Sequence, residues 1–285
     1  MLSPDEQSAM LQRPALADDQ DVRPQVAEII AAVQSDGDAA LFRFAQQFEG
    51  RDVDALRVST AEFRAAEAAL TAESKKAIDL AITNVQRFHE AQIPAAIDVD
   101  ISSGVRCERR SQPIDAVGLY VPSGSAPLPS TAVMLAVPAS IAGCPVRVLC
   151  SPSDQEGKIN AATLYAARRS AIEDVFKIGG AQALAARAYG TETVPRVDRI
   201  FGPGNTWVTT AKNIVAGDPA GASIDMPAGP SEVLVIADVN ASPAFVASDL
   251  LSQAEHGPDS QVLLITTSRD FAAAVISETE RQLAL

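Results

Sequence analysis

Two side chains able to bind a metal ion stand three residues apart near the end of the sequence. His256 is one of two histidines in 285 residues, and Gln253 precedes it by three positions. On a helix this spacing places both side chains on one face of the same turn. An imidazole nitrogen and an amide oxygen presented together can hold a metal or orient a polar substrate. A structural role is the alternative, because a histidine at the C-terminal end of a helix also interacts favourably with the helix dipole.

Helix-boundary signals flank these two residues. Ser242-Pro243 supplies an N-cap residue and a proline at the first helical position. Gly257-Pro258 is a pair that terminates helices. Together they predict a helix over about 243–255 that carries Gln253 in its last turn.

From Asp115 onward, short β-rich runs alternate with helical stretches. This alternation is typical of βαβ units with a mostly parallel sheet, an α/β fold. The carboxyl ends of parallel strands share one sheet edge, where such folds bind ligands. The predicted strands are 116–121, 146–150, 175–178, 199–201, 233–237 and 262–266. The predicted helices lie near 130–142, 159–170, 180–189, 205–215 and 243–255, with another from about 269.

The part of the chain before Asp115 is predicted to be mainly helical. Residues 1–22 are polar and acidic, and we interpret them as an N-terminal arm. Apolar residues at helical spacing over 22–48, interrupted at Ser35-Asp36-Gly37-Asp38, predict two helices. Two further helices, from Thr60 and over about 72–91, and two strand-like runs, 51–58 and 97–108, complete this part.

Four loops rich in glycine, proline and small polar residues are further candidates for chemistry. The first three lie between a predicted strand and a predicted helix, where a ligand can approach the backbone and the helix N-terminus offers free N–H groups to phosphate. Because ordinary turns also need glycine, and no loop has the G-x-G-x-x-G or Walker pattern, the residues alone indicate a nucleotide-type site of uncommon form. A Ser/His/Asp triad is disfavoured, since Ser231 and Ser252 lack a nucleophile-elbow context. The loops are 120–127, 179–182, 202–206 and 225–232.

Composition and charge narrow the class of protein. A length of 285 residues allows two domains, and 47% hydrophobic residues with only 5% aromatics predict cores of Ala, Val, Ile and Leu. The formal net charge of −13 argues against nucleic acid or an anionic membrane as a partner. With no signal-peptide pattern and no apolar run of membrane-spanning length, we expect a cytoplasmic protein. The three cysteines have no metal-knuckle spacing, so we expect them to be reduced and packed.

Four long motifs, in this order, resemble the histidinol dehydrogenase family. They are GLYVPSGSAPLPST, KIGGAQALAARAYGTETVPRVDRIFGPGN, IDMPAGPSEVLVIAD and DLLSQAEHGPDSQVLL, and the resemblance covers about 22–285. It implies an oxidoreductase of amino-acid biosynthesis that takes L-histidinol through the aldehyde to L-histidine, the last steps of histidine biosynthesis, with NAD and Zn²⁺ as cofactors. One departure is Ser123, where the family usually has a second glycine.

The resemblance also implies roles for six residues. Carried over position by position, Tyr120, Gln182 and Asn205 contact NAD. Ser231, Gln253 and His256 contact the substrate, and Gln253 with His256 also binds zinc. No catalytic residue is carried over, because the family's Glu-His pair of bases, with an Asp and a His that complete the zinc shell, lies in a part that has no counterpart in this sequence. We therefore expect a C-terminally truncated chain with little or no activity by itself.

The resemblance further implies two Rossmann-like domains, one inserted in the other, with the final part of the first domain missing. Residues 23–119 with 233–285 would form the first domain, 120–232 the NAD-side domain, and 1–22 the arm. The family is a homodimer with shared active sites. Two alternatives stay open: a non-catalytic remnant that still binds nucleotide, and a related zinc- and NAD-dependent dehydrogenase of another amino alcohol.

Overall fold

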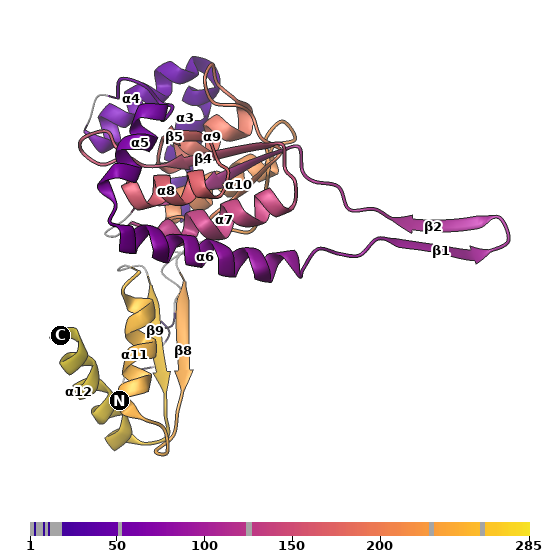
Figure 1. Ribbon diagram of the computed structural model, residues 1–285. Coiled ribbons are helices and arrows are strands. Elements are labelled where there is room, and N and C mark those ends of the chain that lie inside the picture. The colour runs from indigo at the N-terminus through magenta and orange to yellow at the C-terminus, as the bar shows by residue number, and fades with distance from the viewer. Residues whose placement is uncertain are drawn as a thin grey trace. The chain divides into compact units, whose positions relative to one another are not determined.

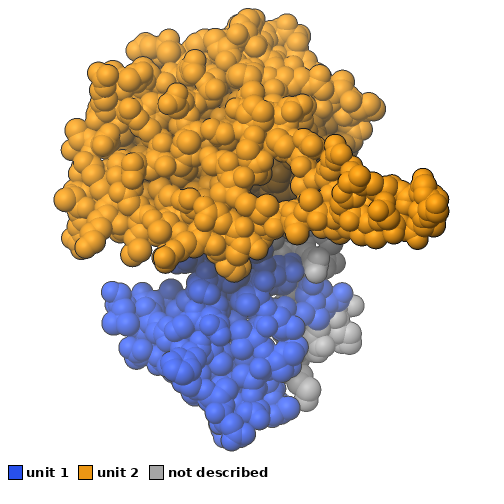
Figure 2. Space-filling model, turned by 45° about the vertical axis from the view of Figure 1, so that its right-hand side comes forward, with its two compact units in different colours: residues 1–22, 228–285 blue, residues 23–227 orange. Residues whose placement is uncertain are grey.

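The computed structural model describes residues 3, 8, 11, 19–50, 53–123, 127–227, 231–256 and 260–285. The chain forms two compact units, coloured separately in Figure 2. Unit 2 is Arg23–Pro227, and unit 1 combines Met1–Val22 with Ala228–Leu285. Each unit has its own hydrophobic core. The predicted domain boundaries, at 119/120 and 232/233, do not coincide with this division and stay a prediction.

A five-stranded parallel sheet forms the centre of unit 2 (Figure 1). Its spatial order is β5-β4-β3-β6-β7, the 3-2-1-4-5 order of a doubly wound α/β sheet. The predicted parallel α/β architecture is therefore confirmed, whereas β7 was not predicted because two residues carry no readable pattern. The strands are β3 (Ala116–Tyr120), β4 (Val146–Ser151), β5 (Asp174–Lys177), β6 (Arg199–Phe201) and β7 (Ser223–Ile224).

Helices cover both faces of this sheet, so its strands need not alternate apolar and polar residues. Val148, Leu149 and Cys150 are consecutive in β4 and have no exposed surface. On one face α7 and α8 pack together and against α5 and α6, and α9 and α10 form a second packed pair. The connecting helices are α7 (Pro129–Ile141), α8 (Ala161–Arg169), α9 (Gly180–Tyr189) and α10 (Thr206–Gly217), close to their predicted ranges.

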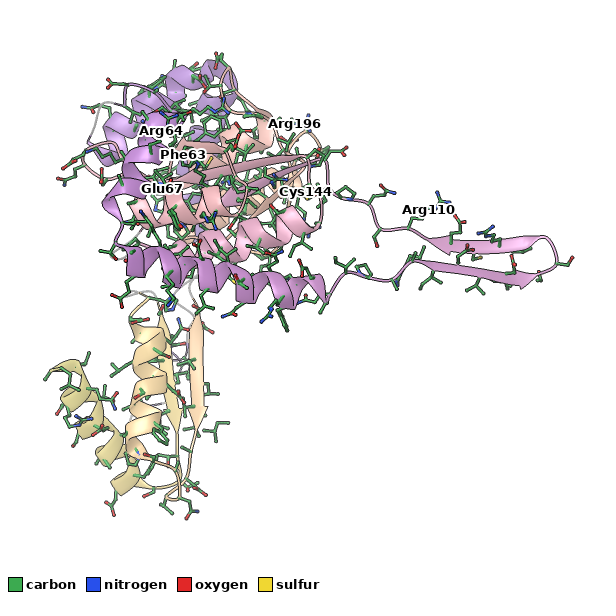
Figure 3. All side chains as sticks on the ribbon, in the orientation of Figure 1. Phe63, Arg64, Glu67, Arg110, Cys144 and Arg196 are labelled. Atoms are coloured by element: carbon green, nitrogen blue, oxygen red, sulfur yellow. The ribbon has the colours of Figure 1, made fainter. Side chains whose placement is uncertain are left out.

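The helices that precede the sheet begin and end at recognisable signals. Gly37, at φ +55°, separates the first two helices inside the predicted interruption. The Ser59 hydroxyl accepts a hydrogen bond from the Glu62 N–H, and the Glu62 carboxylate accepts one from the Ser59 N–H, forming a capping box. Phe63, one turn into the next helix, enters the core (Figure 3). The helices are α3 (Asp19–Asp36), α4 (Asp38–Glu49), α5 (Thr60–Ala69) and α6 (Ala72–Glu90). No helix in the part of the chain that the structure describes is long and apolar enough to cross a membrane.

The two strand-like runs before residue 115 have different outcomes. Residues 97–108 form an antiparallel hairpin of β1 (Ile97–Ser102) and β2 (Val105–Arg109) that extends away from the rest of unit 2 (Figure 1). The strand predicted over 51–58 is wrong for its described residues, which make only an isolated bridge between Arg57 and Phe176. This segment contacts the sheet edge too briefly to form a ladder.

The cysteine prediction holds in part. All three are free thiols, and Cys144 and Cys150 are buried as expected. Cys107 is exposed on β2, so its predicted packing is wrong. An isolated two-stranded hairpin has no second layer that could bury it.

Unit 1 is a small α/β unit whose described residues include a core cluster of five buried side chains. β8 and β9 pair in parallel, and α11 and α12 pack against each other, with α11 against both strands (Figure 1). The helix predicted over about 243–255 is confirmed, with Pro243 in its first turn, although the Ser242 side chain makes no capping bond. The elements are β8 (Glu232–Ile236), α11 (Pro243–Ala254), β9 (Gln261–Ile265) and α12 (Arg269–Leu283).

Candidate active site

The strand order of unit 2 fixes where a ligand crevice can form. Consecutive strands proceed from β3 through β4 to β5 on one side, and β6 and β7 lie on the other side of β3. The switch point of the sheet is therefore between β3 and β6, and ligands of doubly wound folds bind outside the carboxyl ends of the strands at that point. Tyr120 ends β3, and Gly202 directly follows β6. Two of the predicted loops thus start at the switch point.

Tyr120 is held rigidly at this edge. Its side chain is 3% exposed, and its hydroxyl oxygen accepts a hydrogen bond of 3.0 Å from the Gly180 N–H. The guanidinium carbon of Arg187 lies 5.4 Å from the centre of its ring, in cation–π geometry. Burial raises the pKa of Tyr120 to about 12, although the Gly180 N–H and Arg187 act to lower it. The hydroxyl is therefore neutral near pH 7 and keeps its own proton to donate.

The side chains of Gln182 and Tyr120 both lie against Gly180. The Gln182 side chain is 4% exposed and lies in the first turn of α9. Gly180 has φ +62°, and a Cβ added there would lie 2.8 Å from the Gln182 Oε1. The amide therefore folds back over Gly180, the residue that donates to Tyr120. The structure brings together these two predicted NAD contacts, which are 62 positions apart in the sequence.

Asn205 has a structural role in addition to its predicted one. It is the N-cap of α10, and its Oδ1 accepts a hydrogen bond of 3.1 Å from the Val208 N–H. The side chain is exposed, so its amide NH₂ is the group left to meet a ligand. The start of the same loop lies against β3, since a Cβ added to Gly202 would be 2.2 Å from the Tyr120 carbonyl oxygen.

Lys212 and Asp225 also hold this edge; Asp225 begins the predicted 225–232 loop, but no role was predicted for either side chain. Lys212 is completely buried on α10, with its ammonium 2.5 Å from the Asp225 carboxylate. The available signal was a lysine inside the apolar stripe of Val208, Ala211 and Val215, all of them buried. A lysine at such a position must be paired, because an unpaired buried charge is strongly unfavourable.

In unit 1 the structure brings together two of the three predicted residues by a direct hydrogen bond. The Gln253 Nε2 donates to the Ser231 Oγ at 2.8 Å. Ser231 directly precedes β8, and Gln253 lies in the last turn of α11. Because the amide nitrogen is engaged, the Gln253 Oε1 is the atom that remains for a metal or substrate.

His256 lies just beyond the helix that carries Gln253. Its backbone N–H donates to the Gln253 carbonyl oxygen at 3.2 Å, and its side chain is exposed. The predicted terminator Gly257-Pro258 falls outside the described residues. No group of three or more His, Cys, Asp or Glu side chains with metal-binding geometry occurs among the residues that the structure describes. The zinc role of Gln253 and His256 therefore stays a prediction, in which acidic ligands from elsewhere would complete the shell.

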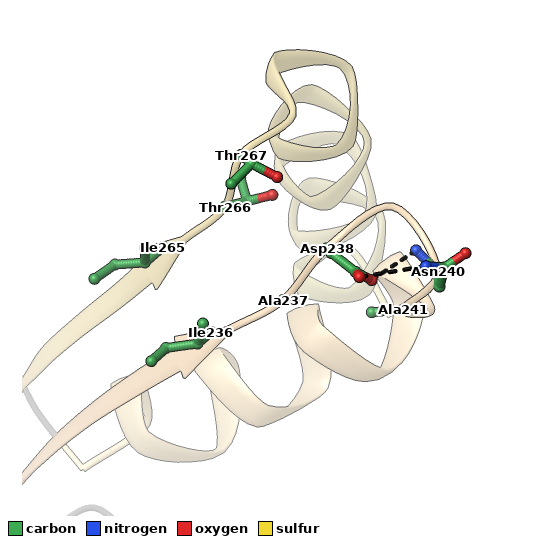
Figure 4. A pocket seen from close by; sticks show the side chains of 8 residues that line it. All are labelled: Ile236, Ala237, Asp238, Asn240, Ala241, Ile265, Thr266 and Thr267. Carbon is green, nitrogen blue, oxygen red and sulfur yellow. Dashed lines mark hydrogen bonds between the residues drawn. The ribbon is translucent and has the colours of Figure 1, made fainter.

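A separate open hollow of about 560 Å³ lies at the carboxyl ends of β8 and β9 (Figure 4). Its polar side comes from Asp238, whose carboxylate accepts hydrogen bonds from Asn240, and from two threonines. It contains none of the predicted site residues. Ser231 stands before the opposite, amino end of β8, so the hollow and the predicted substrate contacts are at opposite ends of the strand.

Comparison with known proteins gives one family over nearly the whole chain. The model of the family described as histidinol dehydrogenase matches residues 11–285. The chain belongs to the histidinol dehydrogenase family. This membership confirms the resemblance found in the sequence.

Relatives named histidinol dehydrogenase are similar over almost all of this chain. Proteins of that name from Aliivibrio fischeri, Vibrio parahaemolyticus and Salmonella typhimurium are each 52% identical over 282 residues, which is 99% of this chain. The crystal structure of histidinol dehydrogenase from Elizabethkingia anophelis superposes with a TM-score of 0.84 at 42% identity, over 94% of this chain. The chain spans only 63–64% of the length of these proteins.

Proposed function

We propose that this histidinol dehydrogenase family chain contributes the cofactor side and part of the metal and substrate side of an NAD-dependent oxidoreductase. The reaction is the two-step oxidation of L-histidinol through the aldehyde to L-histidine, in histidine biosynthesis. The observation that carries the proposal is the family match over residues 11–285, together with relatives of that name at 52% identity. These names favour the dehydrogenase over a non-catalytic remnant.

The residues at the switch point of unit 2 fit a dinucleotide. Tyr120 and Gln182 present a hydroxyl proton and an amide around one glycine, and Asn205 presents an amide NH₂ beside the N-terminus of α10. The N-terminal ends of α9 and α10 carry a positive partial charge, which suits a pyrophosphate. NAD, when bound, supplies the hydride acceptor, and the protein supplies position and orientation.

The residues of unit 1 fit part of a zinc and substrate site. We assign the Gln253 Oε1 and the His256 imidazole as two zinc ligands that also contact L-histidinol, and Ser231 as a further substrate contact. The Ser231–Gln253 hydrogen bond supports this assignment because it orients the amide. Zinc, when bound, supplies a Lewis acid that positions the substrate's polar groups. We assign no catalytic base to this chain.

The finer architecture belongs to the same proposal. We propose two Rossmann-like domains with one inserted in the other, residues 120–232 forming the NAD-side domain and 23–119 with 233–285 the other. The proposed assembly is a homodimer in the cytoplasm, as expected for a biosynthetic enzyme. The doubly wound strand order of the sheet in unit 2 supports a Rossmann-like NAD-side domain.

Calorimetry with the 285-residue chain tests the function without requiring turnover. We expect NAD to bind, and Gln182→Ala to weaken that binding about tenfold, roughly the loss of one good hydrogen bond. We expect L-histidinol to bind only in the presence of Zn²⁺. We expect His256→Ala to abolish this zinc-dependent binding. Asn240→Ala, in the hollow at the other end of β8, is the matched control and should bind both ligands normally.

The outcome of the two titrations separates the alternatives. NAD binding without zinc-dependent binding of histidinol would identify a nucleotide-binding protein that lacks the dehydrogenase substrate site. Absence of NAD binding would contradict the assignment of Tyr120, Gln182 and Asn205. Zinc-dependent binding of a different amino alcohol in preference to histidinol would indicate the related dehydrogenase.

A further inference from the structure

Lys212 is a completely buried lysine with three oxygen partners. Its ammonium donates to the Gly202 carbonyl oxygen at 2.5 Å, to the Asp225 Oδ1 at 2.5 Å and to the Met226 carbonyl oxygen at 3.2 Å. An ammonium has three hydrogens to donate, so its donor capacity is filled. The three acceptors come from two segments, one that starts the 202–206 loop and one that follows β7.

The Asp225 carboxylate links the same two segments by accepting hydrogen bonds from their backbone N–H groups. Its Oδ2 accepts from the Gly202 N–H at 2.9 Å, and its Oδ1 accepts from the Met226 N–H at 2.7 Å. Partial burial acts to raise the pKa of Asp225, but the bonds from Lys212, Gly202 and Met226 outweigh it and hold the pKa below its ordinary value. The Gly202 peptide groups are thus held at both the N–H and the C=O by one ion pair.

The held glycine lies at the switch point. Gly202 has φ +125°, and its backbone packs so closely on Tyr120 that a Cβ would be 2.2 Å from the Tyr120 carbonyl oxygen. Three residues later the same loop presents Asn205, and five residues after Met226 the chain reaches Ser231. Displacement of Gly202 would therefore move the loop that carries Asn205 relative to Tyr120.

We propose that Lys212 and Asp225 are a positioning pair that fixes the 202–206 loop against β3 in the form that receives the dinucleotide. The inference rests on the proposed function, because that function places NAD at this edge. Neither residue needs to touch the cofactor. Their effect is exerted through the backbone of Gly202.

A purely structural role makes a different prediction from a positioning role. Removing one member of a buried ion pair leaves an uncompensated charge, which destabilises the fold, whereas removing both is far less costly. If the pair only stabilises the fold, the double variant should recover stability and cofactor affinity together. If it positions the loop, stability should recover and affinity should not.

The experiment uses Lys212→Met, Asp225→Asn and the double variant in the 285-residue chain. Thermal unfolding reports stability, calorimetry reports NAD affinity, and amide hydrogen exchange reports the order of the loop at residues 202–206. We expect each single variant to lower the melting temperature. We expect the double variant to regain most of that loss, yet to bind NAD at least tenfold more weakly than the wild type and to exchange faster in the loop.

Tyr189→Phe is the matched control. The Tyr189 hydroxyl donates to the Asp218 carboxylate at 2.8 Å, at the C-terminal end of the same helix α10. Its loss should lower stability modestly while NAD affinity and loop exchange stay unchanged. If Lys212→Met fails to fold, Asp225→Asn and the double variant still provide the comparison.

Two results would overturn the inference. One is a double variant that binds NAD as tightly as the wild type. The other is unchanged exchange of the 202–206 amides in every variant. A third result separates the inference from the proposed function. If the wild-type chain does not bind NAD while the double variant loses protection of the 202–206 amides, the proposed function fails but the pair is shown to hold the loop. If the wild-type chain does not bind NAD and loop protection is unchanged in the double variant, the proposed function and the positioning role are both refuted.

Discussion

The predicted cofactor residues lie at the N-terminal ends of helices, whereas the predicted metal residues lie at the C-terminal end of a helix. In unit 2, Gln182 and Asn205 lie at the N-terminal ends of α9 and α10, after the carboxyl ends of strands. In unit 1, Gln253 and His256 lie at the C-terminal end of α11, before the amino end of β9. A helix N-terminus carries a positive partial charge and a C-terminus a negative one. The backbone alone therefore favours an anion at the first site and a cation at the second, as a pyrophosphate and a zinc ion require.

The two sites also differ in how firmly they are held. Tyr120 and Gln182 are almost fully buried in a unit with a large core, and the Tyr120 hydroxyl accepts a hydrogen bond from Gly180, 60 positions later in the sequence. Ser231 and His256 are exposed, and the core cluster of unit 1 has five buried residues among those that the structure describes. The predicted cofactor residues are packed into the fold of unit 2, whereas the predicted metal residues of unit 1 depend on a few surface contacts. Steric changes in the core of the first should therefore lower stability strongly, whereas changes at the exposed residues of the second should act mainly on binding.

The largest expected effect is at the closest backbone contact of the cofactor side. Gly202→Ala places a methyl group 2.2 Å from the Tyr120 carbonyl oxygen at φ +125°. We expect it to lower the free energy of unfolding by about 3 kcal/mol or more, in the range of buried steric strain. Gly143→Ala, at φ +78° with nothing within 4 Å, should cost only about 1–2 kcal/mol. Equal losses in denaturant titrations of the two variants would remove the case for a tight loop contact.

The second effect tests the burial of Tyr120 through pH. Its pKa is raised to about 12 from 10.0 by burial, so its contribution to stability is complete below pH 10 and is lost as pH rises through 12. We expect the free energy of unfolding to fall by about 2–3 kcal/mol between pH 10 and pH 12, which follows from the difference between the two pKa values. Tyr189, whose pKa burial also raises to about 12, contributes in the same direction. Tyr120→Phe should flatten the alkaline slope; a slope identical to that of the wild type would show that the Tyr120 phenol is not desolvated.

A smaller effect, on binding alone, is expected on the metal side. Ser231→Ala removes the hydrogen bond that orients the Gln253 amide. Zinc-dependent binding of L-histidinol should weaken about tenfold, or roughly 1.4 kcal/mol. The free energy of unfolding should change by less than about 0.5 kcal/mol, as for other exposed sites. Ser252→Ala, whose hydroxyl donates within α11 to the Asp249 carbonyl oxygen, is the control and should leave binding unchanged. A large stability loss in Ser231→Ala would erase the contrast between the two sites.

The smallest effect is an acid dependence in unit 1. Hydrogen bonds from Arg281 and then Gln282 lower the pKa of Glu278 on α12 from 4.5 to about 2. Its contribution is therefore present above pH 4.5 and is lost as pH falls towards 2. In Glu278→Gln, amide exchange of α12 should lose part of its acid sensitivity, and Glu280→Gln, an exposed neighbour, should not. If Glu278→Gln retains the full acid response, the contact with Arg281 is too weakly populated in solution to matter.

The sequence by itself determined the order and the approximate bounds of the elements. Helical spacing, the interruption at Gly37 and the proline at the start of the 243–255 helix act within one or two turns, so their effect can be read locally. The alternation after Asp115 likewise predicted the parallel sheet, and the long motifs indicated the family. The run 51–58 was misread because a strand forms only where a partner edge is available, which its own residues do not reveal.

Only the tertiary structure decided which distant side chains meet. Tyr120 reaches Gly180 across 60 positions, and Gln253 reaches Ser231 across 22. The Lys212–Asp225 pair depends on β7 lying beside β6. This placement could not be predicted, because a strand of two residues has no recognisable sequence pattern. Local periodicity fixes which face of an element is apolar, whereas the order of strands in the sheet fixes which loop ends become neighbours. That order results from the packing of the whole unit, and it places the buried ion pair beside the start of the 202–206 loop.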